Sequence, residues 1–271
     1  GKGLQPNRLA DLLGKPALRN FAAGDFFFPS DLGISGVKPR PFHFSRPWGI
    51  PVRYHDYRAI LALSNPDLLE YHLSFKDMGE PVEKYFDKPI DADVVVHSPE
   101  IFEHDHLLDL CSDDAAHRQE SIKNMQRVAD VARAIKRYFG RAGKVLIVTN
   151  VGGFTMKGAI EPESRKPLYR RLEESLAQVD QTDVEIIPQT MPPFPWLFGG
   201  RRFHNLFVDP DEIVDYCQRT GSRICLDISH SKLACNQNHL YLTDFVRKVG
   251  PYTAHMHIVD AAGVDDEGLQ I

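Results

Sequence analysis

The sequence predicts an α/β fold, a parallel (β/α)8 TIM barrel without its last unit, preceded by a small β-rich segment. Seven short runs rich in β-branched residues recur between residues 52 and 259, and helix signals lie between them. Such alternation is typical of a parallel sheet with right-handed crossover helices. Polar side chains directly follow several runs, at the strand ends where parallel barrels carry their functional residues. An open doubly wound sheet is the alternative, but no GxGxxG motif follows the first run.

Length and composition suit one large domain with a small appendage. The chain has 271 residues, of which 42% are hydrophobic and 25% charged, which is enough for a full core. A formal net charge of −5 argues against a nucleic-acid partner. The sequence has neither an apolar run long enough for a membrane span nor a signal peptide, so we expect no membrane partner. The four cysteines form no CxxC pair, which favours reduced thiols and a cytoplasmic location.

The first 49 residues differ from the rest. Residues 1–37 are turn-rich and predict a short helix at 8–13 and strands at 17–21 and 26–28. Residues 38–49 are dense in proline and aromatic residues, which is typical of a linker docked on a neighbour. We expect the barrel to span residues 50–271. The chain starts at Gly1 and stops after an acidic stretch without a closing helix, which indicates a segment of a longer polypeptide.

The barrel elements can be placed in chain order. The expected strands are residues 52–55, 69–74, 93–97, 145–150, 184–189, 224–227 and 253–259. Between the third and fourth, Ser112 can cap a helix that ends at Gly140. The apolar positions of this helix fall on one stripe: Ile122, Met125, Val128, Ala132 and Ile135. Asp209 and Pro210 supply the N-cap and first-turn proline of a helix that ends at Gly221.

The last two strands carry the strongest chemical signals. Asp227 and His230 are close enough to bind one cation, although Asp227 could equally cap the next helix with His230 at the surface. His255 and His257 share one face of the last strand. His257 can serve as a ligand, whereas a hydrogen bond to backbone in the core is favoured for His255. Asp260 follows in the turn, where its carboxylate could orient one imidazole.

Further polar residues end the other strands. His97 ends a nearly continuous apolar strand, and because a buried imidazole without a partner is costly, we expect it in the barrel mouth. Asn150 and Gln189 are amides at positions where ligands would be expected. Asp265 and Glu267 lie in a glycine-flanked acidic loop, which is usually only solvated but here follows a strand with ligand-type residues. The array predicts a metal site.

The connection after Gln189 is long and aromatic. It contains more apolar surface than a solvated loop tolerates, from Phe194, Trp196, Phe198, Phe203 and Phe207. Trp196 could stack on a sugar ring while Arg201 and Arg202 reach a carboxylate or phosphate. The alternative is a subunit interface, as in a homo-oligomer, or a surface that holds the N-terminal segment.

These strand-end motifs resemble the xylose-isomerase-like barrel superfamily, which contains sugar and sugar-phosphate isomerases and epimerases and endonuclease IV. CLDISH at residues 225–230 and HMHIVD at residues 255–260 are the most specific parts. The resemblance implies a divalent cation (Mn, Zn or Co) and a sugar or sugar-phosphate substrate. It implies these metal ligands: Gln189, Asp227, His257, Asp265 and Glu267. His230 or His97 would assist proton transfer, and Asn150 would contact substrate.

Two positions depart from the superfamily pattern. Gln189 stands where nearly all members have glutamate, and Asn150 where the endonuclease branch has histidine. An amide brings no negative charge and cannot act as a base, so metal affinity should fall. The departures favour a second hypothesis, a catalytically degenerate sugar-binding or scaffolding module. A divergent nuclease is a third hypothesis, disfavoured by the net acidity.

Residues 1–37 carry a second resemblance. The order of a glycine-rich turn, "LGK", and a "GD" turn before "DL" is similar to the latter part of the antifreeze-like (SAF) domain that ends sialic acid synthases. The two resemblances together imply a sialic acid synthase-like polypeptide whose additional barrel acts on a sugar of nonulosonic acid biosynthesis.

Overall fold

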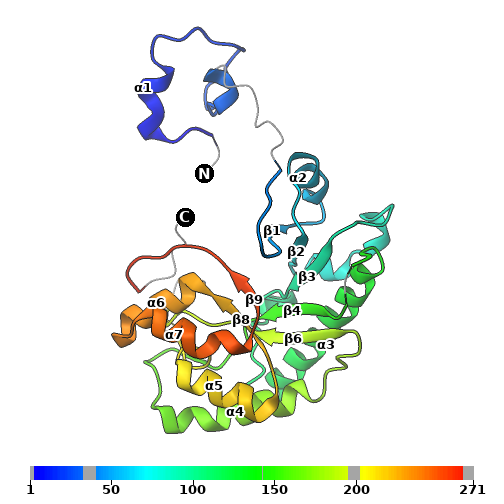
Figure 1. The fold of residues 1–271 in the computed structure, drawn as a ribbon, viewed down its shortest axis with the longest axis vertical. Helices are drawn as coiled ribbons and strands as arrows, with labels where there is room; N and C mark the ends of the chain where they lie inside the picture. The colour runs from blue at the N-terminus through cyan, green and yellow to red at the C-terminus, as the bar shows by residue number, and fades with distance from the viewer. Residues whose placement is uncertain (1–2, 33–40, 142, 195–201, 265–271) are drawn as a thin grey trace.

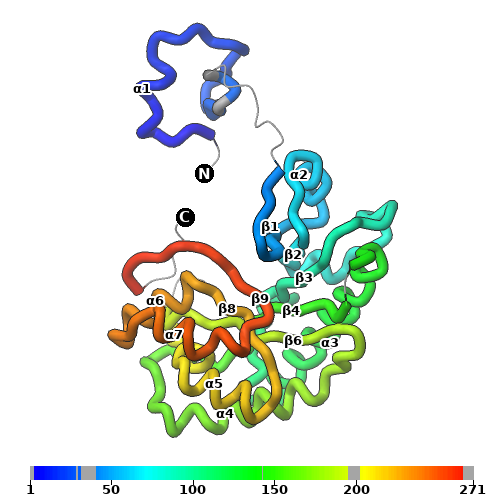
Figure 2. Tube along the Cα trace, viewed as in Figure 1, coloured from blue at the N-terminus to red at the C-terminus, as the bar shows by residue number. Residues whose placement is uncertain are grey.

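A computed structural model describes residues 3–32, 41–141, 143–194 and 202–264, and seven parallel strands form its centre (Figure 1). These strands are β1 Gly49–Val52, β2 Leu68–His72, β3 Asp93–His97, β4 Val145–Thr149, β6 Val184–Pro188, β8 Ile224–Asp227 and β9 Thr253–His257. The first five follow one another in one sheet, and β8 pairs with β9. A single parallel bridge between Gln189 and Cys225 joins the two sheets. The colours of Figure 2 therefore follow chain order around the barrel.

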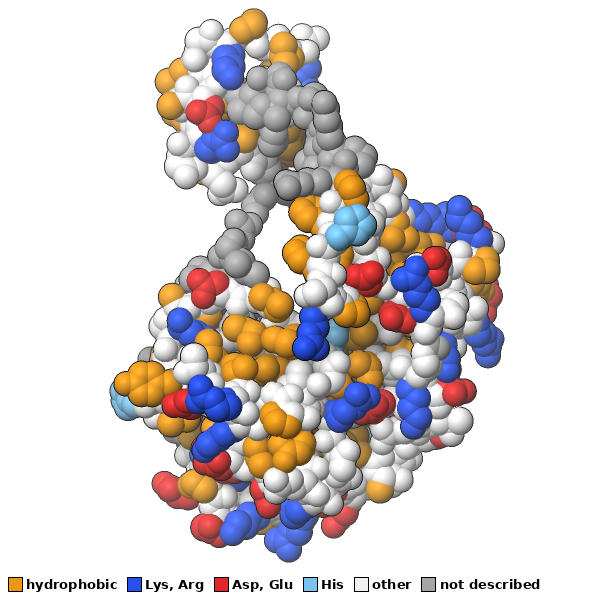
Figure 3. Space-filling view, viewed as in Figure 1, with side chains coloured by type: hydrophobic (Ala, Val, Ile, Leu, Met, Phe, Trp, Pro, Cys, Tyr) orange, Lys and Arg blue, Asp and Glu red, His pale blue; other side chains and the backbone are white. Residues whose placement is uncertain are grey.

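The barrel has an open side between β9 and β1. Among the described residues no backbone hydrogen bond joins these two strands. A cavity of about 1250 Å3 runs along the barrel interior and is lined by both strands. Hydrophobic side chains gather beside β9 on the face shown in Figure 3. In and just after this strand, Met256 is 44% and Ile258 63% exposed. The site described below faces this cavity.

Alternating side chains of each strand separate two environments. One set packs under the helices in the main core, and the other set faces the barrel interior. Val95, Val148, Ile187 and Cys225 form a small apolar cluster inside the barrel. Glu70 lies in register with Val95, so a carboxylate shares this apolar interior. Such a carboxylate needs partners, because burying an unpaired charge is very costly.

The strand positions agree with the sequence prediction except at the first strand, which was expected at 52–55. Strand β1 ends at Val52 because a turn begins at the next residue. There the carboxylate of Asp56 accepts a hydrogen bond from the backbone N–H of Arg53 at 2.7 Å. The side-chain turn therefore replaces further strand pairing.

Helices cover the outside of the strands. They are α2 Tyr57–Leu63, α3 Ala115–Lys136, α4 Pro162–Leu176, α5 Pro210–Thr220, α6 Ile228–Asn238 and α7 Leu242–Val249. The short 3-10 turns among them are η3 Asp77–Gly79, η4 Val82–Lys84, η5 Glu103–Asp105 and η6 Gly250–Tyr252. No helix within the described ranges is both long and apolar enough to cross a membrane.

Two helices test the capping predictions. The predicted apolar stripe of α3 is buried, but the N-cap is Asp114 and not Ser112. Asp114 accepts from the backbone N–H groups of Ala116 and His117. Ser112 lies two residues earlier, so its hydroxyl is too far away to accept from these groups. In α5 the prediction is confirmed, with Asp209 as the N-cap and Gly221 in the left-handed conformation at the end.

The N-terminal segment contains helix but no strand in residues 3–32. Its elements are η1 Pro6–Arg8, α1 Leu9–Leu12 and η2 Pro29–Leu32. The predicted helix at 8–13 is therefore confirmed, whereas the predicted strands at 17–21 and 26–28 and the β-rich character are wrong. Residues 17–21 and 26–28 have the composition of strands but pair with no neighbouring strand in the described part of the segment. A single backbone hydrogen bond, from the N–H of Leu4 to the carbonyl of Phe27, joins the second stretch to another extended part of residues 3–32.

The described part of the linker, residues 41–48, contacts the barrel. Phe42 exchanges two hydrogen bonds with the side chain of Asn65 in the barrel. Within the linker, the rings of Phe42 and Phe44 pack edge-on against Trp48. This agrees with a docked proline and aromatic linker. The expected domain boundary at residue 37 lies outside the described residues.

Candidate active site

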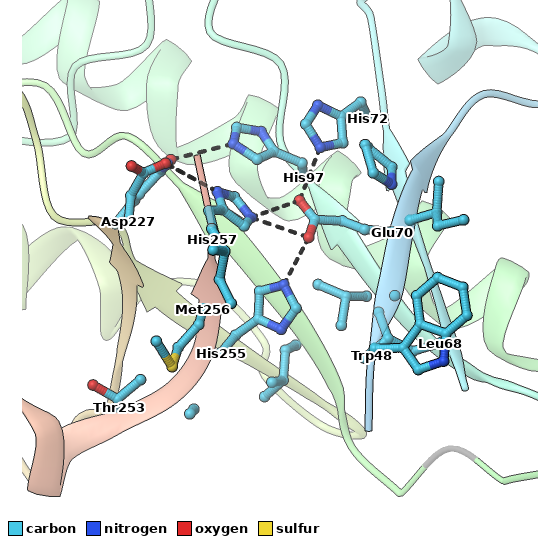
Figure 4. Close-up of a pocket in the computed structure, with 18 of the residues that line it drawn as sticks. Trp48, Leu68, Glu70, His72, His97, Asp227, Thr253, His255, Met256 and His257 are labelled. Atoms are coloured by element: carbon cyan, nitrogen blue, oxygen red, sulfur yellow. Dashed lines mark hydrogen bonds and ion pairs between the residues drawn. The ribbon is translucent and has the colours of Figure 1, made fainter. Parts of the chain in front are cut away.

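A polar cluster lies inside the barrel at the carboxyl ends of the strands (Figure 4). Its members come from four strands, β2, β3, β8 and β9, and from the residue after β6: Glu70, His72, His97, Gln189, Asp227, His255 and His257. All seven line the cavity. The strands carry them inward because they occupy the alternate positions that face the barrel interior.

Glu70 is the most heavily bonded member. Its carboxylate lies 2.9 Å from His72 Nε2, 2.7 Å from His255 Nε2 and 3.0 Å from His257 Nε2. Burial alone would raise the pKa of Glu70, but the hydrogen bonds from the three imidazoles outweigh it and hold the pKa well below its usual range. Glu70 is therefore a buried anion at neutral pH.

Asp227 uses both of its oxygens, one to cap a helix, as one of the two interpretations expected, and the other within the polar cluster. Oδ1 caps helix α6 by accepting from the backbone N–H of His230 at 2.9 Å and from the hydroxyl of Ser229 at 2.8 Å. Oδ2 lies 3.0 Å from Gln189 Nε2 and 3.3 Å from His257 Nδ1. Burial opposes ionisation, but these hydrogen bonds and the neighbouring imidazoles lower the pKa of Asp227. Asp227 is thus a second buried anion.

His257 connects the two carboxylates. Its Nδ1 faces Asp227 and its Nε2 faces Glu70, so the ring lies between two negative charges. Burial disfavours its protonation, yet the carboxylates raise the pKa of His257 well above its usual value. The cluster therefore stabilises positive charge at its centre.

His97 and Gln189 meet through acceptor atoms. His97 Nδ1 donates to the backbone carbonyl of Ser98 at 3.0 Å, since a carbonyl can only accept. Burial, and then the neighbouring His72, lower the pKa of His97 to about 4, so the ring is neutral and its Nε2 carries a lone pair. That atom lies 3.2 Å from Gln189 Oε1, a second acceptor. Two lone pairs consequently face each other inside the barrel.

His230 stands at the edge of the cluster. It is not the surface residue of the alternative interpretation, because its side chain is only 16% exposed. Its Nδ1 donates to the backbone carbonyl of Thr190 at 2.9 Å and lies 3.7 Å from Asp227. This bond fixes the ring orientation at the cavity wall.

One subset of the cluster fits a cation. Single ligand atoms of Glu70, His97 and His257 all lie within 4.8 Å of one another. Imidazole nitrogen and carboxylate oxygen together suit zinc, manganese or cobalt. The residues present therefore fit the divalent ion that the sequence predicted.

Other residues predicted for the site lie elsewhere or outside the described residues. Asn150 Oδ1 accepts from the backbone N–H of Gly152 at 2.9 Å and so closes its own turn. Arg202 packs over the ring of Phe154 at 5.1 Å and does not line the cavity. Asp260 is exposed and accepts from the N–H of Ala261. The remaining four fall outside the described residues: Trp196, Arg201, Asp265 and Glu267.

The described part of the aromatic connection joins two loops of the barrel mouth. Strand β7, Phe203–His204, pairs antiparallel with β5, Phe154–Thr155, in the loop after β4. Asn205 reinforces the pairing by donating to the carbonyl of Gly153 at 2.9 Å and to Thr155 Oγ1 at 3.0 Å. Phe207 belongs to the core, where it packs on Tyr169 and Tyr216 and is fully buried. Part of the aromatic excess is therefore ordinary core.

Three members of the cluster correct the sequence interpretation. Glu70 and His72 were not singled out, although a glutamate inside the apolar run LLEYH was a visible signal. His255 was expected to bond to backbone, but it bonds to Glu70. The reason is that Glu70 comes from β2, 185 residues earlier in the chain, so no local pattern shows the pair.

The architecture and the sequence profile agree on the family. The profile described as "Xylose isomerase-like TIM barrel" matches residues 63–271. The chain belongs to this family. Searching curated proteins for relatives found no match.

Solved structures share the xylose isomerase-like fold at low identity. A D-tagatose 3-epimerase-like protein is 18% identical over 82% of this chain and 79% of its own, with a TM-score of 0.54. A xylose isomerase domain protein from Planctomyces limnophilus is 12% identical over 84% and 82%, with a TM-score of 0.51. An L-ribulose 3-epimerase is 13% identical over 79% and 69%, also at 0.51. At such identities the likeness shows the fold alone.

Proposed function

We propose that this protein is a metal-dependent isomerase or epimerase of a small sugar or sugar phosphate. The observation that carries the proposal is the polar cluster, in which two buried carboxylates and several imidazoles line a cavity of about 1250 Å3. Groups of this kind, placed at the carboxyl ends of barrel strands, suit chemistry on a small polar molecule. The solved structures named as ketose 3-epimerases share the fold and support this choice.

The polar cluster has the donors for a divalent cation such as manganese, zinc or cobalt. Gln189, Asp227 and His257, expected from the sequence, lie together within hydrogen-bond distance. A bound divalent cation would polarise a carbonyl and the adjacent hydroxyl of the substrate. Carboxylate and imidazole groups of the polar cluster would supply its ligands.

Proton transfer falls to His230 in this proposal. Gln189 cannot accept a proton, and His97 has one nitrogen bonded to Ser98 and a pKa of about 4. His230 has its Nδ1–H held by Thr190, so a proton from the substrate carbon would be received at Nε2. The ring lies at the cavity wall, where a bound sugar would contact it.

We place the activity in nonulosonic acid biosynthesis, with an amino sugar or its phosphate as substrate. The support is the similarity of residues 1–37 to the SAF domain of sialic acid synthases. The four cysteines are all free and buried, which fits the reducing cytoplasm.

The proposal is tested by following hydrogen exchange in D2O. The protein, loaded in turn with manganese, cobalt or zinc, is incubated with ketoses, aldoses, amino sugars and their phosphates, and products are read by NMR. Proton abstraction and return from solvent should place deuterium on the epimerised carbon. His230→Asn should reduce the rate at least 100-fold, whereas the exposed His239→Asn should leave it unchanged. Absence of turnover and of exchange with every sugar would reject the proposal.

A non-catalytic sugar-binding module is the second candidate, favoured by the uncharged amide at Gln189 in the centre of the cluster. The substitution Gln189→Glu separates the two. A degenerate site should gain metal affinity and show no turnover, whereas a tuned enzyme should lose activity. Cleavage of DNA with an abasic site would instead favour a nuclease.

A further inference from the structure

We propose that the cation binds deeper in the barrel than the set expected from the sequence, with Glu70 of β2 as its carboxylate ligand. The ligands in this arrangement are Glu70, His97 and His257, with the amide oxygen of Gln189 as the fourth. Asp227 then orients His257 and does not touch the metal. The inference rests on the proposed function, because it names the ligands of the same site.

The contact between His97 and Gln189 supports this position. His97 Nδ1 lies 3.0 Å from the Ser98 carbonyl, an acceptor, so the neutral ring that a metal ligand requires carries its proton there and presents the lone pair of Nε2 to the amide oxygen at 3.2 Å. Reversing the amide would bring its oxygen to 3.0 Å from the ionised carboxylate of Asp227 instead. Either orientation leaves two acceptors face to face, which is unfavourable in a buried site. A cation between His97 Nε2 and Gln189 Oε1 turns both atoms into ligands.

The partners of Asp227 argue against a direct bond to the metal. Four donors surround its two oxygens, namely His230 N, Ser229 Oγ, Gln189 Nε2 and His257 Nδ1. A carboxylate has about four lone-pair positions, so these donors occupy them all. Two of the donors, a backbone N–H and an amide N–H, cannot be ligands themselves. Breaking these bonds would also uncap helix α6.

The partners of Glu70 are of a different kind. Each of them is an imidazole nitrogen: His72 Nε2, His255 Nε2 and His257 Nε2. An imidazole nitrogen can give up its proton and bind a cation, so this neighbourhood can change from hydrogen bonds to coordination without new residues. His72 and His255 would keep the carboxylate oriented from its two oxygens.

Asp227 and His257 complete the arrangement. When His257 Nε2 binds the cation, its Nδ1–H is left to donate to Asp227 Oδ2, at 3.3 Å. Ligand histidines almost always donate their other N–H to a carboxylate or carbonyl in this way. The two carboxylates also balance the double charge of the cation inside the barrel. Glu70 thus supplies the negative charge that position 189 lacks.

The test measures cobalt(II) and zinc binding to the full chain, with a matched pair of nearly isosteric variants. Glu70→Gln should weaken binding more than 100-fold and change the visible absorption of bound cobalt. Asp227→Asn should weaken it only about 10-fold, as for partners that orient a ligand, and preserve the cobalt spectrum because the ligands are unchanged. His97 is not among the ligands expected from the sequence, so His97→Ala should weaken binding more than 100-fold only if the cation lies at the deeper position. Circular dichroism confirms that each variant is folded.

The opposite pattern would overturn the inference. If Glu70→Gln and His97→Ala bind cobalt as the parent does while Asp227→Asn loses it, the cation lies on the expected set and the proposed function stands. A parent chain that binds neither metal below millimolar concentration also overturns the inference. The proposed function is then judged separately by sugar turnover in D2O. If Glu70→Gln fails to fold, His97→Ala with its cobalt spectrum decides the matter.

Discussion

Gly152→Ala is expected to destabilise the protein far more than a typical glycine substitution. Gly152 has a φ of +87°, and an added Cβ would lie in hard contact with the Asp109 carboxylate and 2.5 Å from its Cα. Asp109 cannot yield freely, because Oδ1 accepts from the N–H groups of Cys111 at 2.9 Å and Gly153 at 3.0 Å.

The magnitude follows from these contacts. A left-handed alanine costs about 1 kcal/mol, and displacing Asp109 removes two hydrogen bonds of about 1 kcal/mol each and leaves buried donors unpaired. We expect a total loss of about 3–4 kcal/mol. Gly221→Ala is the matched control, since Gly221 has a φ of +72° but no atom within 4 Å of the added Cβ. It should lose only about 1 kcal/mol.

Urea unfolding followed by circular dichroism measures both losses. The midpoint should fall in each variant while the slope stays constant, which shows that stability and not compactness has changed. If the two variants differ by less than about 1 kcal/mol, the Asp109 contact does not constrain the loop, and the reasoning is refuted.

Three further predictions test other parts of the structure. Burial raises the pKa of Glu212 to about 7, above the ordinary 4.5, so the folded state holds an extra proton between these values and the free energy of unfolding falls as the pH rises through them. Glu212→Gln removes this loss and should therefore gain about 1–3 kcal/mol relative to the parent between pH 5 and pH 8, as measured by urea unfolding at both; an unchanged difference would contradict the raised pKa. Asn205 is fully buried in the connection after Gln189 and bonds to Gly153 and Ile160 in the loop after β4, so Asn205→Ala should cost about 2–3 kcal/mol and speed proteolytic cleavage in both loops. Cleavage rates equal to those of the parent would refute its role in joining the loops. Burial raises the pKa of all four thiols, Cys111, Cys217, Cys225 and Cys235. None should therefore react with Ellman's reagent before unfolding, and all four should react afterwards. Fast labelling of the native protein would show that a thiol is accessible and would contradict this prediction.

The architecture was predictable because strand and helix patterns are local. Seven β-branched runs separated by amphipathic helices leave few topologies, and all seven strands lie where or near where they were expected. Cap positions are less certain from sequence. Ser112, Asp113 and Asp114 are all residue types that cap helices well, so composition alone does not select Asp114, which is the observed N-cap of α3. The predicted strands near Phe27 fail because a strand needs partners that composition cannot reveal.

The site was predictable only in part. His97, Gln189, Asp227 and His257 stand at strand ends, where the barrel geometry brings them together. Glu70 lies in the middle of a strand, and two of its imidazole partners, His255 and His257, belong to a strand near the other end of the sequence. Long-range pairing of this kind leaves no periodic signal in the sequence.

The bond between β2 and β9 has a consequence for how the chain folds. Glu70 meets His255 and His257 across 185 and 187 residues of sequence, so this contact closes one of the longest loops in the domain. Contacts of such high sequence separation form late, after the strands between them have aligned. Until β9 docks, Glu70 lacks the imidazoles of His255 and His257. If cobalt binds at the polar cluster, the appearance of its visible absorption during refolding would report when β9 docks, which is the last step of barrel assembly in this order of events.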